Sequence, residues 1–87
     1  MPRIFIPPLL RTLTGDVHEV DVEATSVRQA IDALEARFPG VRSRLCDGDG
    51  LKPGLNVAVD GHIRHVGLLA RVKPDSEVHF LPAIGGG

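Results

Sequence analysis

The residues with the clearest chemical potential in this sequence are its last three, Gly85, Gly86 and Gly87. They follow a segment with the pattern of a β-strand, Glu77 to Leu81, after a short apolar connection. Glycine has no side chain and the widest backbone freedom, so such an end neither packs nor orders by itself. Two interpretations fit. The glycines are a frayed end or an expression remnant, or they form a thin arm that carries the Gly87 carboxylate into a narrow active site on another protein.

A lone cysteine, Cys46, is the second group that could do chemistry. One cysteine excludes an intramolecular disulfide and a cysteine-rich metal site, and it fits a reducing compartment. Its thiol could act as a nucleophile or carry a persulfide. However, Cys46 follows Leu45 at the end of an expected helical turn, where a free cysteine is commonly just buried. We therefore interpret Cys46 as a structural residue.

Neither the histidines nor an acidic loop predicts a metal site. Strand parity places His18 and His79 on opposite faces of a sheet, where they could not share an ion. The segment Asp47 to Gly50 starts like a calcium loop, but Leu51 and Ala58 stand at ligand positions. No phosphate-binding loop and no acid–base or nucleophilic constellation is present in the sequence. We expect no metal, no catalytic residue and no enzymatic activity, and interpret the histidines as surface residues: His18, His62, His65 and His79.

The composition is that of one small domain. The chain has 87 residues, of which 43% are hydrophobic and 24% charged, and its net charge is −1. Without a positive field, and with no Trp or Tyr, it lacks the features that bind nucleic acid. The apolar run Ile4 to Leu10 is broken by Pro7 and Pro8 and is too short to span a membrane. We expect a cytoplasmic protein with neither nucleic acid nor membrane as a partner.

Periodicity predicts one main helix after an early hairpin. Strands are expected over residues 3–6 and 17–22, joined through the turn residues Thr14-Gly15-Asp16. Ser26 and Gln29 have the spacing of a capping box, in which each side chain satisfies a free backbone N–H. The apolar positions behind it recur at helical spacing: Val27, Ala30, Ile31, Leu34 and Phe38. Pro39-Gly40 ends this helix, and a helical turn over residues 41–46 and a loop over residues 47–54 are expected next.

The remaining pattern predicts the fold. Strands are expected over residues 55–59, 62–66 and 77–81, and Asp60-Gly61 predicts a type I′ turn between the first two. This order indicates an α+β fold, with one helix packed on one face of a mixed sheet of four to five strands. If the last strand returns beside the first, the two pair in parallel and the fold is the β-grasp, the fold of ubiquitin. Strand parity then turns Leu81 away from the core.

Two segments carry a resemblance to a known family. The ending Glu77-Val78-His79-Phe80-Leu81-Pro82-Ala83-Ile84-Gly85-Gly86-Gly87 resembles that of the ThiS/MoaD family of sulfur carrier proteins, where a last strand runs into a proline, small apolar residues and a terminal diglycine. Residues 6–15, with Pro7-Pro8 and Thr14-Gly15, are similar to the first-strand region of the family, and most of all to its members in cysteine biosynthesis. The predicted helix and the Asp60-Gly61 turn also lie where the family has them, so the resemblance covers the whole chain.

The resemblance implies a mechanism and a set of partners. A ubiquitin-activating-type adenylyltransferase would use ATP to adenylate the C-terminal carboxylate, and sulfur from a donor would then leave a thiocarboxylate. The sulfur would pass to a biosynthetic enzyme such as a cysteine synthase, while molybdopterin, thiamine and secondary-metabolite pathways stay open. No cofactor is implied for the carrier itself.

The resemblance also assigns roles to residues. Gly87 would hold the reactive carboxylate, although three glycines stand where the family usually has two, so Gly85-Gly86 could be the working pair instead of Gly86-Gly87. A tail-processing protease would join the partners if Gly87 had to be removed first. Leu81, Pro82 and Ile84 are the expected partner contacts. We expect a β-grasp domain over residues 1–84 and a flexible glycine tail over residues 85–87.

Two other functions stay open at this point. A ubiquitin-like modifier, joined through Gly87 to lysines of target proteins, would share both the fold and the activation step. A passive interaction module, in which the glycines are incidental, would keep its function when Gly86 and Gly87 are deleted.

Overall fold

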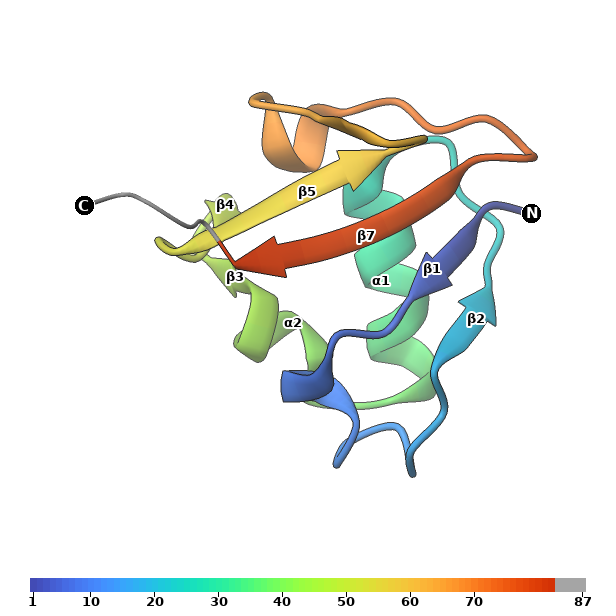
Figure 1. Cartoon of the computed structure of the whole chain (residues 1–87). Helices are drawn as coiled ribbons and strands as arrows, with labels where there is room; N and C mark the ends of the chain where they lie inside the picture. Colours follow the sequence, from blue (N-terminus) through green and yellow to red (C-terminus); the bar gives the residue numbers. More distant parts are fainter. Residues whose placement is uncertain (83–87) are drawn as a thin grey trace.

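A mixed five-stranded sheet and one long helix organise the molecule (Figure 1). The computed structural model describes residues 1–82. The strands stand in the order β2-β1-β7-β5-β6, and their bounds are β1 Arg3–Phe5, β2 Glu19–Asp21, β5 Leu55–Val59, β6 His62–Ile63 and β7 Glu77–Pro82. Helix α1 (Val27–Arg37) lies on one face of this sheet, followed by the short α2 (Val41–Leu45). Two 3₁₀ turns, η1 (Pro8–Leu10) and η2 (Gly67–Leu69), lie in the connections.

The last strand returns beside the first, as the sequence predicted. β7 pairs in parallel with β1, with Ile4 opposite Val78, and both side chains are fully buried. On its other side β7 pairs antiparallel with β5, with Val57 opposite Phe80. A central parallel pair flanked by two antiparallel hairpins, under a single helix, is the β-grasp arrangement.

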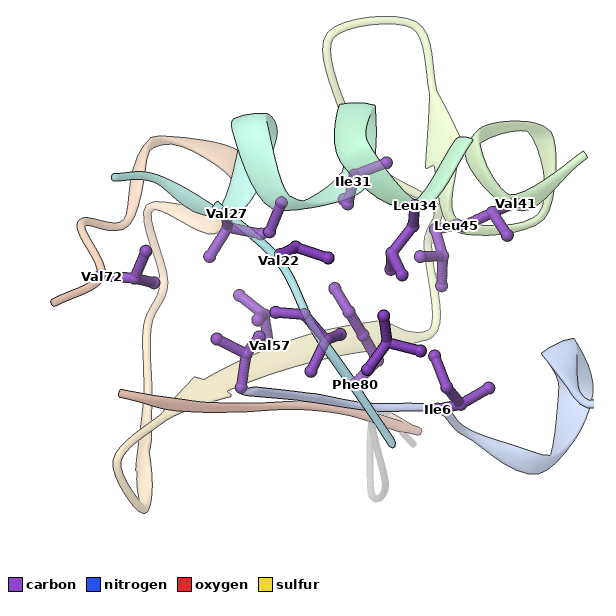
Figure 2. Close-up of a cluster of buried hydrophobic side chains, with 14 of the residues drawn as sticks. Ile6, Val22, Val27, Ile31, Leu34, Val41, Leu45, Val57, Val72 and Phe80 are labelled. Atoms are coloured by element: carbon purple, nitrogen blue, oxygen red, sulfur yellow. The ribbon is translucent and has the colours of Figure 1, made fainter. Parts of the chain in front are cut away.

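The core fills the space between α1 and the sheet (Figure 2). The predicted stripe of α1 faces it, because Val27, Ala30, Ile31 and Leu34 are all buried. Phe38, the last position of that stripe, is the C-cap and only half-buried. The α1 stripe therefore packs onto inward side chains of the strands: Ile4, Val20, Val57, Val59, Val78 and Phe80.

The helix start combines the expected cap with an unexpected one. The Ser26 hydroxyl accepts a hydrogen bond from the Gln29 N–H at 3.2 Å, as predicted. The side-chain amide oxygen of Gln29, however, accepts hydrogen bonds from the N–H and the hydroxyl of Thr25 at 2.8 and 2.9 Å. A capping box would instead use the N–H of the N-cap residue Ser26, one position later in the chain. Residue Thr25 thus offers two donors at once, which explains why the Gln29 amide turns to it.

Three predicted segments are shorter or more ordered than expected. β2 begins at Glu19 instead of Val17, because the Val17 N–H still bonds to the Thr14 carbonyl inside the turn. The predicted return strand over residues 62–66 is paired only at His62 and Ile63. The loop after α2 contains a small antiparallel pair, β3 (Cys46–Asp47) with β4 (Gly50–Leu51), which cover too few residues for strand periodicity to register.

The Asp60-Gly61 turn does more than reverse the chain. Both residues have positive φ, 53° and 84°, as a type I′ turn requires. The Asp60 carboxylate also accepts bonds from the Ser76 hydroxyl and the Glu77 N–H, each at 2.9 Å. These two bonds fasten the β5–β6 hairpin to the first residue of β7. They also lower the pKa of Asp60, because both donors favour the charged carboxylate. The Glu77 N–H has the larger effect and the Ser76 hydroxyl the next largest.

None of the helices among residues 1–82 has the length and apolar character that a membrane crossing needs.

Candidate functional site

The C-terminal half of β7 is paired with one neighbouring strand only, β5. β1 pairs with β7 as far as Phe5 opposite His79 and then turns away at Pro7 and Pro8, which limit further pairing. β5 continues alongside, with Asn56 opposite Leu81 and Leu55 opposite Pro82. Proline has no N–H to donate, so Pro82 is tolerated at a point where one side of the strand is free. β7 therefore carries the chain to the sheet edge and ends there.

The predicted contact residues of this segment are partly described. Leu81 has 37% of its surface exposed, and it alternates with the buried Val78 and Phe80, so it points away from the core as predicted. Pro82 is exposed beside it. Ile84 and the glycines Gly85, Gly86 and Gly87 lie outside the described residues. Their proposed roles, and the boundary between residues 84 and 85, stay predictions.

The sheet face opposite α1 carries a row of side chains that the sequence pattern did not predict. The register aligns Phe5 with His79, His79 with Ala58, and Ala58 with Ile63, across β1, β7, β5 and β6. Ala58 is only 5% exposed even though it faces away from the helix, whereas Ile63 is 47% exposed. An aromatic and aliphatic strip thus crosses the open face of the sheet, two pairing positions before Leu81.

A hollow of about 390 Å³ lies beside this strip, at the carboxyl ends of β1 and β7. It is lined by one residue of β1, five of the connection that follows it, one of β2 and three of β7: Phe5, then Ile6, Pro7, Pro8, Arg11 and His18, then Glu19, and His79, Phe80 and Leu81. His18 and His79, which the sequence predicts on opposite faces of the sheet, both line this hollow, as does the buried Phe80, the core-facing neighbour of His79 in β7. His18 precedes β2, so strand parity does not govern it.

Cys46 lies in a different place and does not look reactive. It lines a hollow on the helix side together with Arg28 and Arg42, each of which is paired with a carboxylate, Asp49 and Asp32 respectively. Burial raises the pKa of the Cys46 thiol, which reduces its thiolate fraction and outweighs the nearby cations. Among residues 1–82, no group of three or more His, Cys, Asp or Glu side chains is placed to hold a metal ion.

The fold and the free strand end together define a class, the ubiquitin-like β-grasp proteins. The sequence model of the ThiS family matches residues 4–87, so the chain belongs to the ThiS family. The match therefore includes both segments that carried the resemblance in the sequence, residues 6–15 and residues 77–87.

Within this class the chain is similar to proteins called CysO. It is 34% identical to the sulfur carrier protein CysO of Mycobacterium tuberculosis (strain ATCC 25618 / H37Rv) over 91 aligned residues, covering 97% of this chain and 96% of that one. The crystal structure of the Amycolatopsis orientalis BexX/CysO complex contains a chain with a TM-score of 0.90 and 34% identity, with full coverage of both chains. Crystalline Mycobacterium tuberculosis CysO gives a TM-score of 0.86 at 27% identity, covering 97% of this chain and all of that one.

The chain is also similar to solved structures of proteins called SAMP1. The crystal structure of SAMP1 from Haloferax volcanii matches with a TM-score of 0.71 and 27% identity, covering 99% of this chain and 98% of that one. A second crystal structure, that of the Haloferax volcanii small archaeal modifier protein 1, matches with a TM-score of 0.67 and 25% identity, covering 95% of this chain and 97% of that one.

Proposed function

We propose that this protein is a sulfur carrier that receives sulfur as a thiocarboxylate on Gly87. The observation that carries the proposal is the family match, which continues past the exposed end of β7 to residue 87. Relatives named sulfur carrier protein CysO, aligned over nearly the whole chain, support the same role. The β-grasp domain then acts as a handle, and the glycine tail presents the acyl group.

The chemistry follows from the properties of a carboxylate. A terminal carboxyl group has a pKa of about 3.3–3.7, so at neutral pH it is ionised and resists nucleophiles. Attack of its oxygen on the α-phosphate of ATP, in the partner's active site, would form an acyl-adenylate and release pyrophosphate. A sulfide-level nucleophile would then displace AMP and leave the thiocarboxylate. Because the partner supplies ATP and the acid–base groups, the carrier needs no catalytic residue and no cofactor of its own.

The glycines suit the tail to a narrow channel. Each residue near the reacting carbonyl lacks a side chain and can adopt backbone angles that other residues rarely reach. Gly86-Gly87 is the proposed working pair, because Gly87 holds the carboxylate that would be adenylated. If trimming of Gly87 came first, Gly85-Gly86 would take this role and a protease would be a further partner.

The proposed partners dock where the tail leaves the sheet. Leu81 and Pro82 are exposed there, and Ile84 would continue the contact. The partners are an adenylyltransferase of the ubiquitin-activating type, a sulfur donor and a sulfur-accepting biosynthetic enzyme. A cysteine synthase is the first choice of acceptor, because the curated relatives are CysO proteins. We place the reaction in the cytoplasm.

Intact-mass analysis tests this proposal directly. The protein is incubated with the adenylyltransferase of the same organism, ATP and a sulfur source. We expect a mass increase equal to the exchange of one oxygen for sulfur, confined to the C-terminal peptide and absent without ATP. A protein whose mass stays unchanged while the enzyme activates a second, known carrier would contradict the proposal.

A second candidate function is supported by the similarity to SAMP1. A protein modifier would use the same activated Gly87 to form isopeptide bonds with lysines of target proteins. Purification of the tagged protein from its own cells distinguishes the two functions. Isopeptide-linked adducts without any sulfur on the free protein would favour the modifier.

A further inference from the structure

Arg11 stands out because its backbone is held by hydrogen bonds while no other residue in the described range 1–82 bonds to its side chain. The Arg11 N–H donates to the Pro8 carbonyl at 3.2 Å, closing the turn η1. The Arg11 carbonyl in turn accepts bonds from the Asp16 N–H at 2.9 Å and from the buried Thr14 hydroxyl at 3.4 Å. These hydrogen bonds hold the backbone of Arg11 in place where its side chain lines the hollow.

The guanidinium of Arg11 has one nitrogen without a hydrogen-bond partner among residues 1–82. Its Nε is buried and forms no hydrogen bond, the one buried side-chain nitrogen or oxygen in residues 1–82 in this state. Three other arginines have carboxylate partners: Arg3 bonds to Asp21, Arg28 faces Asp49 and Arg42 bonds to Asp32. A buried donor without an acceptor destabilises a fold, so a partner group that accepts a hydrogen bond from it would remove that cost.

The surroundings of Arg11 suit a carboxylate. Ile6 and Phe80 are buried side chains that line the hollow, and the ring pair of Phe5 and His79 forms one of its sides. Within the described residues, the one acidic side chain that lines it is Glu19, which faces Arg3 at 3.7 Å. Arg11 and two imidazoles thus stand in a partly apolar recess, where a planar guanidinium binds a carboxylate most strongly.

We propose that the Arg11 hollow receives an aspartate or glutamate side chain of the activating enzyme when the two proteins dock. This inference rests on the proposed function, because it takes the adenylyltransferase as the partner. The hollow shares Leu81 with the end of β7, so a carboxylate held by Arg11 would sit beside the start of the tail. The pair would fix the angle at which the tail enters the enzyme.

Binding of the full-length protein to the adenylyltransferase, measured by titration calorimetry without ATP, tests this. We expect Arg11→Gln to weaken the complex by about 10- to 100-fold, since it removes one partner of a desolvated charge pair. Arg11→Lys keeps the charge but loses the planar fork, and should fall between Arg11→Gln and the unaltered protein. Arg44→Gln, on the exposed side of α2, is the matched control and should change affinity by less than about threefold.

A second readout separates binding from folding. Since Arg11 Nε has no hydrogen-bond partner within residues 1–82, Arg11→Gln should leave the melting temperature unchanged or raise it. A large fall in melting temperature would make Arg11 a structural residue and overturn the proposal. Unchanged affinity of Arg11→Gln would overturn it too. So would a shift of the Arg11 Nε resonance on deletion of Gly86 and Gly87 without the enzyme, because the chain's own end would then be the occupant.

The outcome is independent of the proposed chemistry. If the unaltered protein gains sulfur while Arg11→Gln binds equally well, the function stands and the inference fails. If no sulfur is gained but Arg11→Gln loses its affinity, the inference stands and the function fails.

Discussion

The rings of Phe5 and His79 stack at a centroid distance of 4.2 Å and an angle of 7° across the parallel pair β1–β7. Phe5 comes from the first strand and His79 from the last, so this contact exists only when β7 returns beside β1. The stack stands on the open face of the sheet, between Ala58 and the Arg11 hollow. It therefore links closure of the fold to the shape of the surface beside the tail.

The stack should contribute measurably to stability. We predict a coupling free energy of about 0.5–1.5 kcal/mol between Phe5→Ala and His79→Ala in a double-mutant cycle, as for other stacked ring pairs. Urea denaturation of the four proteins measures it. A matched cycle of Phe5→Ala with His65→Ala, an exposed histidine outside this stack, should give no coupling. Equal values in both cycles would contradict a specific contribution of the stack.

Leu81 should matter for docking and little for folding. We predict that Leu81→Ser weakens the complex with the adenylyltransferase by about 5- to 30-fold, because an apolar contact beside the tail is lost. The free energy of unfolding should fall by only about 1 kcal/mol, because 37% of Leu81 is already exposed and the fully buried side chain would contribute about 1.5–3 kcal/mol. Leu69→Ser, at a 71% exposed position on η2, is the control. An equal loss of affinity in both variants would argue against a docking role for the end of β7.

Removal of Gly87 should decide which glycine pair is used. We predict that a chain ending at Gly86 gains no sulfur under conditions in which the full-length chain does, because the tail becomes one residue too short for the enzyme. Circular dichroism and melting temperature should be unchanged. Intact-mass analysis of both chains gives the answer. Faster sulfur transfer to the shorter chain would instead indicate Gly85-Gly86 and a trimming step.

Asp60 should make the protein sensitive to acid. Its pKa is lowered in the folded state, so the stability it contributes is fully present above the unfolded value of about 3.9 and is lost as pH falls through the folded pKa. We predict that Asp60→Asn, which tolerates the same positive φ, lowers the melting temperature at pH 7. The difference from the unaltered protein should shrink below pH 4.

Thermal melts of both proteins from neutral to acid pH measure this effect. Asp75→Asn, at an exposed aspartate for which no bond to its carboxylate is seen in the described residues, serves as the control and should leave the melting temperature at pH 7 close to that of the unaltered protein. If the melting temperatures of Asp60→Asn and the unaltered protein differ by the same amount at every pH, the bonds to Ser76 and Glu77 do not depend on the charge of Asp60.

Local rules predicted most elements of the fold correctly. The stripe of α1, its Ser26 cap and the Asp60-Gly61 turn depend on residues a few positions apart, so periodicity and turn chemistry suffice to find them. The parity of Leu81 was predicted for the same reason. The start of β2 was not, because a bond between Val17 and Thr14 extends the turn by two residues.

By itself the sequence determined the element order, the α+β class, the glycine ending and its family. The tertiary structure alone decided the bond network of Asp60 with Ser76, the stack of Phe5 on His79, and the hollow beside Arg11, whose buried Nε bonds to no other described residue. The physical reason is that sequence patterns report contacts between near neighbours in the chain. Strand register and burial arise from segments that meet only after the whole sheet has assembled.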